Sequence, residues 1–441
     1  MKPSYYNLSA PDETGGAVVF NTRSGCMAQL DREHWEALRA FEERGEVPAD
    51  GEFRDGLLAC GFAVEDRGNE LEAIRLGLLR SRFATETLSL TIAPTQDCNF
   101  RCVYCYEKDQ LRHQVMDRET REKLLDYVTG LADHIRRLHI CWYGGEPLLA
   151  QDTIRELSEA FLRLCGEHHV DYSASIITNG SLLDEKTIDL LNQCRVTQAQ
   201  VTLDGSRASH DSRRPLAGGG SSFDAILRSL KLCRDHYRGA VALRMNVDKN
   251  NLSEIGEVKA LLKQEELDRA VFLYLGHVTD ENGTCAEGSC LGGCEFARRN
   301  LEFLLDQEDG GERFRNGVPR PITNCCGADY GMAWVMGPDG RLYRCLEDIG
   351  IEARVIGDIH TPDALTDPAL YAAFLLYDPT QDPECAQCKY LPLCMGGACP
   401  RARLNGHRNC EGVAEQVRTY LSHPEQFEEV TEEPEEGSPA S

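Results

Sequence analysis

The sequence predicts an α/β fold in which a parallel sheet is flanked by a small N-terminal α+β unit, winged-helix-like, and by a cysteine-rich C-terminal region. At 441 residues the chain exceeds one ordinary core, which favours two or three domains. From about Thr87 to Gly276 six apolar strands alternate with helices, which indicates a parallel sheet whose simplest closure is a chain-order barrel. Cysteines then recur at short intervals from Asn324 to Cys410.

The N-terminal unit covers residues 1–83. Short strands begin at Ala17, an amphipathic pattern predicts a helix from about Asp31 to Arg44, and GFAVED at residues 61–66 predicts a return strand. The unit carries no cluster of catalytic residue types. We therefore expect it to recognise a partner or to pack on the barrel.

Residues 84–282 are expected to form the barrel. The predicted strands are residues 87–95, 137–147, 173–180, 199–205, 240–249 and 270–276, and the predicted helices are about residues 117–136, 152–166, 184–194, 222–237 and 252–265. Sites in such sheets lie at the carboxyl ends of the strands. A cysteine loop follows the first strand, and Gly144–Pro147, Thr178–Gly180 and Asp204–Gly205 follow the next three.

Charge and hydropathy exclude several classes of partner. The formal net charge of −25 argues against nucleic acid and against an anionic membrane, because phosphate binding needs clustered Lys and Arg. No run approaches the ~20 apolar residues of a membrane span, and the N-terminus lacks the apolar core of a signal peptide. We therefore expect a cytoplasmic protein with no membrane partner.

A reducing compartment keeps cysteine pairs open, so the 20 cysteines do not indicate a disulfide framework. They indicate metal or cluster ligation instead. Isolated cysteines are instead expected to be small buried hydrophobes. These are Cys26, Cys60, Cys141, Cys165, Cys194 and Cys233.

The first cysteine group lies in DCNFRCVYCYEK, which sets Cys98, Cys102 and Cys105 in a C-x3-C-x2-C array. Three thiolates are one ligand fewer than a tetrahedral zinc ion or a four-iron cluster needs, and no His or Cys follows at zinc-knuckle spacing. The array therefore leaves one coordination position open, where a [4Fe-4S] cluster can bind and reduce a small molecule.

This array resembles the signature of the radical SAM superfamily, and Gly144–Pro147 matches that family's GGEP motif. The resemblance implies a partial (β/α)6 barrel, a [4Fe-4S] cluster on the three cysteines, and S-adenosylmethionine as a second cofactor. In the family, S-adenosylmethionine chelates the open iron and is cleaved to a 5′-deoxyadenosyl radical.

The resemblance also implies which residues bind S-adenosylmethionine: Tyr104, Gly144, Gly145, Glu146, Pro147, Asn179, Asp204 and Arg244. The GGEP motif is expected to hold the methionyl amino group, through a carboxylate and through backbone carbonyls that only glycine lets approach so closely. Tyr104 is expected beside the adenine. Asn179, Asp204 and Arg244 are expected at the ribose and the methionyl carboxylate, with turn-forming residues and a surface arginine as the alternatives.

The second cysteine group consists of Cys326, Cys345, Cys385, Cys388, Cys394, Cys399 and Cys410. Their spacing indicates metal ligation, and two zinc sites are an alternative to iron and sulfide. The group resembles the SPASM domain of radical SAM peptide maturases, which carries two auxiliary [4Fe-4S] clusters, so three clusters are expected in all. By that pattern Cys326, Cys345 and Cys399 hold the first auxiliary cluster, and the other four cysteines hold the second.

The first auxiliary cluster departs from the SPASM pattern in two respects. One residue more than usual separates Cys394 from Cys399, which predicts a bulged loop. The fourth ligand is ambiguous, because Cys325, Cys290 and Cys294 are all candidates and an open position would suit a substrate thiolate. Alternatively, Cys290 and Cys294 form a clasp with Cys285.

The remaining boundaries follow from composition. Residues 283–323 are expected to form a bridging loop and helix, and residues 324–421 the SPASM domain. Residues 422–441 are rich in Glu with Pro, Gly and Ser, which predicts a disordered tail.

The resemblance implies a peptide maturase that consumes S-adenosylmethionine and oxidises its substrate. The N-terminal unit is similar to the extension of ribosomal-peptide maturases that takes up a precursor as an added strand. The most specific expectation is a Cys-to-carbon thioether crosslink in a small precursor peptide, with flavodoxin or ferredoxin as electron donor.

Two alternatives remain. A sulfatase-type maturase that forms formylglycine resembles this chain in its clusters, but it typically has Asp directly after the cysteine of G-x4-C. Leu346 occupies that place, and Glu347 and Asp348 follow as candidate catalytic bases. A non-catalytic iron–sulfur or structural metal protein is the alternative from another class, and it has no use for a GGEP motif.

Overall fold

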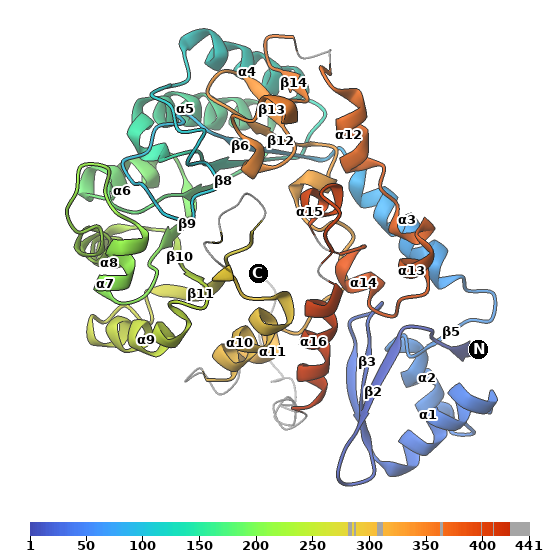
Figure 1. Ribbon diagram of the computed structural model, residues 1–441. Helices are drawn as coiled ribbons and strands as arrows, with labels where there is room; N and C mark the ends of the chain where they lie inside the picture. Colours follow the sequence, from blue (N-terminus) through green and yellow to red (C-terminus); the bar gives the residue numbers. More distant parts are fainter. Residues whose placement is uncertain are drawn as a thin grey trace, which may run out of the picture.

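The computed structural model describes residues 1–280, 285, 288–306, 312–361, 365–397, 399–408 and 410–423. Its centre is a sheet in the order β11-β10-β9-β8-β7-β6-β12-β13-β14. The first six of these strands are parallel and follow chain order, which confirms the predicted sheet (Figure 1). They are β6 (Thr87–Ile92), β7 (Arg137–Trp142), β8 (Asp171–Ile177), β9 (Val196–Thr202), β10 (Ala240–Val247) and β11 (Val271–His277).

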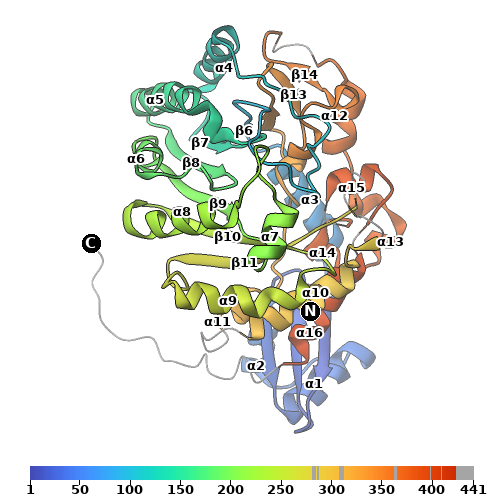
Figure 2. The same cartoon turned by 60° about the vertical axis from the view of Figure 1, so that its left-hand side comes forward.

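Helices line one side of these strands, as Figure 2 shows. They are α4 (Arg118–Leu131), α5 (Gln151–His168), α6 (Glu185–Gln193), α8 (Phe223–His236) and α9 (Ile255–Gln264). Their apolar sides and the strands share one buried core, in which Phe161 of α5 packs with Trp142 of β7. Asp117 and Asp184 begin α4 and α6 by accepting a hydrogen bond from a backbone N–H of the first turn. The first predicted helix ends at Leu131 rather than near residue 136.

The sheet continues past β6 with strands of the C-terminal region. β12 (Ala333–Met336) pairs in parallel with β6, and β13 (Arg341–Tyr343) and β14 (Gly357–Asp358) follow in antiparallel orientation. We expected a separate domain to begin at residue 324. The cysteine-rich region instead shares the central sheet with the barrel strands.

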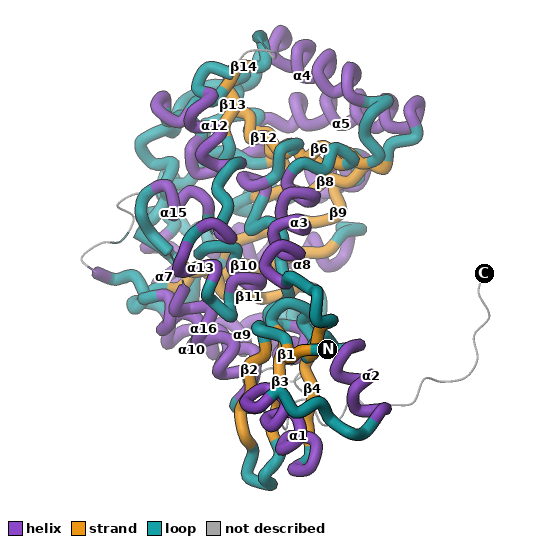
Figure 3. The backbone as a smooth tube through the Cα atoms, turned by 90° about the vertical axis from the view of Figure 1, so that its right-hand side faces the viewer, coloured by secondary structure: helices purple, strands orange, loops and turns teal. Residues whose placement is uncertain are grey.

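The N-terminal unit is α+β, as expected. Its antiparallel sheet consists of β2 (Asn7–Pro11), β3 (Ala17–Asn21) and β4 (Met27–Leu30). A second, two-stranded sheet pairs β1 (Lys2–Pro3) with β5 (Ala63–Val64). The helices of the unit are α1 (Arg32–Arg44), α2 (Gly51–Ala59) and α3 (Glu70–Arg82). β3 is the central strand, and both of its faces are buried. One face packs on Trp35 of α1, whereas Val18 and Phe20 on the other face pack on Leu393 and Val417. Figure 3 shows β2, β3 and β4 below the strands of the central sheet.

Short helices make up most of the C-terminal region. They are α10 (Gly293–Leu305), α11 (Glu312–Asn316), α12 (Pro368–Leu375), α13 (Pro383–Ala386), α14 (Leu391–Cys394), α15 (Pro400–Leu404) and α16 (Cys410–Leu421). A further helix, α7 (Arg207–Arg213), lies between β9 and α8 and was not predicted. In the part of the chain that the structure describes, no helix is long and apolar enough to cross a membrane. The predicted disordered tail lies, from residue 424 on, outside the described residues.

Candidate functional site

A cavity of about 250 Å³ lies at the carboxyl ends of the barrel strands, where the sequence predicts the site. Four parts of the chain line it: the cysteine loop after β6, the segments at the ends of β7 to β11, the segment after α7, and the segment after β13. Its lining includes Cys98, Cys102, Tyr104, Cys105, Tyr143, Gly144, Gly145, Asn179, Arg214, Arg244, Asn246, Leu346 and Glu347.

The cysteine loop presents all three of its thiols to this cavity. The loop is fixed to the segment after α7, where Arg101 N donates to Pro215 O at 2.8 Å. Burial raises the pKa of the Cys98 and Cys105 thiols to about 12, so a metal cluster would displace protons on binding. Among the described residues no fourth cysteine lines the cavity. The donor set therefore fits a [4Fe-4S] cluster with one open iron.

Gly144 and Gly145 let the end of β7 pass directly over the cysteine loop. A Cβ atom on Gly144 would lie 2.4 Å from the Thr95 carbonyl oxygen, and one on Gly145 would lie 2.3 Å from that of Asp97. Gly144 also has a φ of +108°, which side-chain-bearing residues rarely adopt. Only glycine fits at these two positions, and both line the cavity.

Glu146 does not line the cavity. Its carboxylate is fully buried and accepts hydrogen bonds from Leu148 N at 3.0 Å, from Thr178 Oγ1 at 2.7 Å and from Asn179 N at 2.7 Å. Burial raises the pKa of this carboxyl group, and the three donors lower it. The carboxylate thus joins the loop after β8 to the loop after β7. Its contact with the methionyl amino group stays a prediction. Pro147 is also buried and begins a short 3₁₀ helix.

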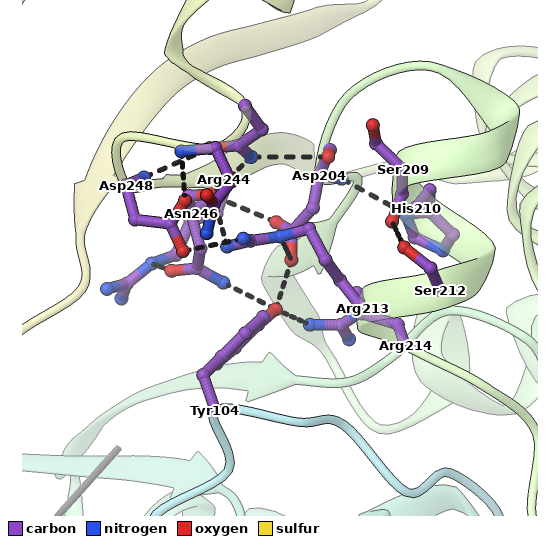
Figure 4. Close-up of polar contacts among 12 residues, drawn as sticks. Tyr104, Asp204, Ser209, His210, Ser212, Arg213, Arg214, Arg244, Asn246 and Asp248 are labelled. Carbon is purple, nitrogen blue, oxygen red and sulfur yellow. Dashed lines mark hydrogen bonds and ion pairs between the residues drawn. The ribbon is translucent and has the colours of Figure 1, made fainter. Parts of the chain in front are cut away.

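Tyr104 belongs to a buried polar network in the cavity wall (Figure 4). Its hydroxyl donates to the Asp204 carboxylate and accepts from Arg214 Nη1 at 2.7 Å and from Asn246 Nδ2 at 3.1 Å. Asp204 is fully buried, and its second oxygen accepts from the Asn246 backbone N–H at 2.8 Å. Asp204 therefore orients Tyr104 and does not line the cavity, and its contact with the cofactor stays a prediction.

Asn179 and Arg244 do line the cavity. Asn179 Nδ2 donates to Asn99 Oδ1 at 2.8 Å, and Arg244 Nε donates to Asn246 Oδ1 at 2.7 Å. Arg214 is a second cation in this wall, although it is only 7% exposed, and sequence reasoning missed it. Its only signal was an Arg-Arg-Pro run in a segment that was not predicted to be helical.

Tyr143 is another cavity residue that sequence reasoning missed. It is 7% exposed, lines the cavity, and packs with Tyr106 and Leu346. Tyr106 follows Cys105 directly, and Leu346 follows Cys345 directly. The three-cysteine loop and the Cys345 segment therefore share one wall of the cavity.

The two candidate bases differ in position. Glu347 lines the cavity, and its Oε2 lies 3.2 Å from Arg401 Nη1. Asp348 is 1% exposed, does not line the cavity, and pairs with Arg401 Nε at 2.8 Å. Of the two, only Glu347 can touch a molecule in the cavity.

The C-terminal cysteines lie as two groups. Burial raises the pKa of the Cys326 thiol to about 11, with smaller contributions from Asp329 and Cys399. Burial also raises the pKa of the Cys345 thiol, and Cys399 contributes to that shift as well. In the second group, the pKa of the Cys385 thiol is raised by burial and by the neighbouring Asp382, Cys394 and Cys410. The pKa of the Cys394 thiol is raised by burial and by Cys388. The Cys326 and Cys345 thiols are thus both affected by Cys399, whereas burial, with contributions from Cys326 and Cys394, raises the pKa of the Cys325 thiol.

Within the described ranges, no three or more His, Cys, Asp or Glu side chains converge on a point that could hold one metal ion.

The candidates for a fourth ligand of the first auxiliary cluster also separate. Cys290 forms a disulfide with Cys285, which agrees with two of the three members of the alternative clasp. Cys294 Sγ lies 3.7 Å from Glu411 Oε2. Cys325 lies beside Cys326, and its Sγ is 3.4 Å from the Cys394 carbonyl oxygen. Cys325 therefore remains the candidate nearest to the predicted set.

The six isolated cysteines are only partly as expected. Cys165, Cys194 and Cys233 are buried, whereas Cys26, Cys60 and Cys141 are half-buried.

Comparison with known proteins places this site in context. Residues 92–262 match the model of the radical SAM superfamily. The chain is 32% identical over 215 residues to Fe-coproporphyrin III synthase of Methanosarcina barkeri, and this match covers 48% of the chain and only 49% of that protein. It is 27% identical over 336 residues to a serine-type anaerobic sulfatase-maturating enzyme of Klebsiella aerogenes, which covers 71% of the chain and 79% of that enzyme.

Two solved structures share the fold. One is anSMEcpe with bound AdoMet and Cp18Cys peptide, with a TM-score of 0.60 and 21% identity over 77% of this chain and 98% of that chain. The other is Streptococcus suis SuiB bound to the precursor peptide SuiA, with a TM-score of 0.51 and 14% identity over 92% of this chain and 97% of that chain.

Proposed function

We propose that this chain, whose residues 92–262 match the radical SAM superfamily, is a peptide maturase that uses S-adenosylmethionine and [4Fe-4S] clusters to modify a bound peptide oxidatively. In its most specific form the proposal is a Cys-to-carbon thioether crosslink in a ribosomally made precursor. The observation that carries it is the cavity wall that the three-cysteine loop and the Cys345 segment share through Tyr143.

The cofactors supply hydrogen-atom abstraction from an unactivated carbon. Cys98, Cys102 and Cys105 would hold the iron–sulfur cluster. The chain otherwise has to orient the substrate and to exclude water. Arg214 and Arg244 offer guanidinium groups to a carboxylate, and the glycine backbone at the end of β7 can approach an amino group closely.

Oxidation of a substrate carbon requires that an electron leave the cavity after the hydrogen atom is removed. Leu346 and Glu347 border the cavity and come directly after Cys345, a predicted ligand of the first auxiliary cluster. A short path from substrate to an electron acceptor supports net oxidation. The initial reducing electron would come from a flavodoxin or ferredoxin.

The N-terminal sheet is the proposed docking place for the precursor. Among the described residues β4 has a strand partner on one side only, so a peptide can add to it as a further strand. The opposite edge is less suitable, because β2 ends in Pro11 and its Asn7 carbonyl oxygen already accepts from Lys389 Nζ at 2.8 Å. The fold of SuiB, which is bound to the precursor peptide SuiA, covers 92% of this chain and so supports a peptide substrate.

Formylglycine formation on a sulfatase is the second candidate. The identity to a serine-type sulfatase-maturating enzyme supports it, and so does a carboxylate, Glu347, in the cavity wall. Against it stands Leu346 at the position where such maturases typically carry the Asp base. The anSMEcpe likeness also leaves about a quarter of this chain without a counterpart while covering nearly all of anSMEcpe.

Mass spectrometry after anaerobic reconstitution separates the two candidates. The enzyme is supplied with dithionite, S-adenosylmethionine and either a Cys-rich peptide encoded beside its gene or a peptide from a sulfatase active site. Loss of two hydrogens per crosslink in the first peptide supports the proposal, and an unchanged mass with inverted residues indicates epimerisation instead. An aldehyde in the sulfatase peptide alone supports the second candidate, and 5′-deoxyadenosine without any modified peptide contradicts both.

A further inference from the structure

Helix α15 starts directly after Cys399 and carries two buried arginines that face two other cysteine segments. Arg401 is 3% exposed, and the side chain of Arg403 is 6% exposed. Each of them pairs with a carboxylate that stands three residues after a predicted ligand of the first auxiliary cluster. The pairs therefore tie α15 to both remaining cysteine segments of that cluster.

The first pair reaches the Cys345 segment. Arg401 Nε lies 2.8 Å from Asp348 Oδ1, and Arg401 Nη1 lies 3.2 Å from Glu347 Oε2. A second guanidinium, that of Arg354, approaches Asp348 Oδ1 to 4.0 Å. These contacts hold Asp348 as a buried anion, which argues against a role as a catalytic base.

The second pair reaches the Cys326 segment. Arg403 Nη2 lies 3.2 Å from Oδ1 of Asp329, which is fully buried. The other oxygen of Asp329 accepts from the Cys325 backbone N–H at 3.2 Å. The Arg403 guanidinium also stacks on the Tyr377 ring, 4.2 Å from its centroid. The position of the Cys325-Cys326 turn thus depends on the orientation of Arg403.

Stability alone does not explain two such pairs on one short helix. Replacing a buried ion pair by apolar residues is often neutral or stabilising, because desolvation of both charges offsets their attraction. A buried pair does, however, fix the relative position of the segments that carry it. Here those segments are the three that bear Cys326, Cys345 and Cys399.

We propose that Arg401 and Arg403 are positioning residues that assemble Cys326, Cys345 and Cys399 into one ligand set and hold two cations beside it. The inference rests on the proposed function, because it presumes an auxiliary cluster at these cysteines. It also gives the cations an electrostatic role. The thiolates and the three carboxylates Asp329, Glu347 and Asp348 are all anionic, so removing a guanidinium makes reduction of a cluster at this place harder.

The test compares charge removal with charge retention on α15. Arg401→Met and Arg403→Met keep an extended side chain without its charge, whereas Arg401→Lys and Arg403→Lys keep the charge. Arg39→Met is the matched control, because Arg39 pairs with Glu43 on the exposed side of α1. Each protein is reconstituted anaerobically, and iron per chain, the electron paramagnetic resonance spectrum and the midpoint potentials are measured.

Wild type and the Arg39 control are expected to hold about twelve irons per chain, as roughly three four-iron clusters require. Each methionine variant should fall to roughly eight irons or show a more negative auxiliary potential, and the signal that S-adenosylmethionine perturbs should stay. The lysine variants should recover most of the loss. Full iron with unchanged potentials in both methionine variants would overturn the proposal.

A double variant, Arg401→Met with Asp348→Asn, guards against simple misfolding. It removes both charges of the pair and should melt near the wild-type temperature while it still lacks auxiliary iron or keeps the shifted potential. Restored iron and potential in this variant would show that the arginine does not position the ligands. None of these readouts uses a peptide, so failure to modify any peptide would contradict the proposed function and leave this test intact.

Discussion

Acidification from about pH 7.5 to about pH 5.5 is expected to destabilise the fold through His210 of α7. This side chain is fully buried, and its Nδ1 accepts a hydrogen bond from the Asp204 backbone N–H at 3.0 Å. A proton on Nδ1 would face that N–H directly. Burial, and then the positive charge of Arg214, lower the pKa of His210 to about 3, with Arg213 acting in the same direction and Asp211 opposing.

The sign and the size of the effect follow from proton linkage. Because the pKa is depressed in the folded state, the contribution of His210 to stability is present above the unfolded value of about 6.5 and is lost as the pH falls toward 3. Between the two chosen pH values only the unfolded chain takes up this proton. The free energy of unfolding should therefore fall by about 1.4 kcal/mol from this group alone.

His210→Gln isolates this contribution, because a glutamine oxygen can accept from the Asp204 N–H and does not titrate. Urea unfolding of wild type and variant is measured at both pH values, and contributions of the other histidines cancel in the difference. The wild type should lose about 1.4 kcal/mol more than the variant on acidification. Equal losses in the two proteins would refute a neutral, hydrogen-bonded His210.

Three further outcomes are expected. Gly145→Ala should reduce 5′-deoxyadenosine formation by about tenfold or more, since the added Cβ would clash with backbone atoms. Gly130→Ala on α4 should leave it unchanged, because no atom outside the helix backbone lies within 4 Å of the added Cβ. Tyr104→Phe leaves the buried Asp204 carboxylate without one donor and should cost about 1–3 kcal/mol of stability in a denaturation experiment; no loss would contradict the network of Figure 4. Glu347→Gln should lower peptide modification while 5′-deoxyadenosine still forms, because Glu347 lines the cavity. Asp348→Asn should mainly lower the melting temperature, because Asp348 belongs to a buried ion pair. The reverse pattern would contradict both assignments.

Local patterns predicted the parts of the site that depend on local chain geometry. The C-x3-C-x2-C loop and the two glycines after β7 lie where the strand pattern puts them, because a strand end fixes where its next residues begin. The direction of a side chain at a strand end depends on the neighbouring loops. The resemblance implied that Glu146 and Asp204 contact the cofactor, and it could not show that each carboxylate accepts hydrogen bonds from an adjacent segment.

Residues missed by sequence reasoning owe their place to tertiary structure. Arg214 follows a seven-residue helix, α7, whose polar sequence gives no clear helical pattern. The addition of β12 to the β6 edge was not foreseeable either, because more than two hundred residues separate the two strands. Such distant pairing depends on which edge remains free after the barrel strands have formed.

The burial of β3 on both faces has a consequence for synthesis of the protein. Val18 and Phe20 emerge from the ribosome more than 370 residues before Leu393 and Val417, which cover them. At about 5–20 residues per second this face stays uncovered for roughly 20 to 80 s. A nascent chain therefore exposes an apolar sheet face with a free edge throughout that time, and it depends on a chaperone or on fast completion to avoid aggregation.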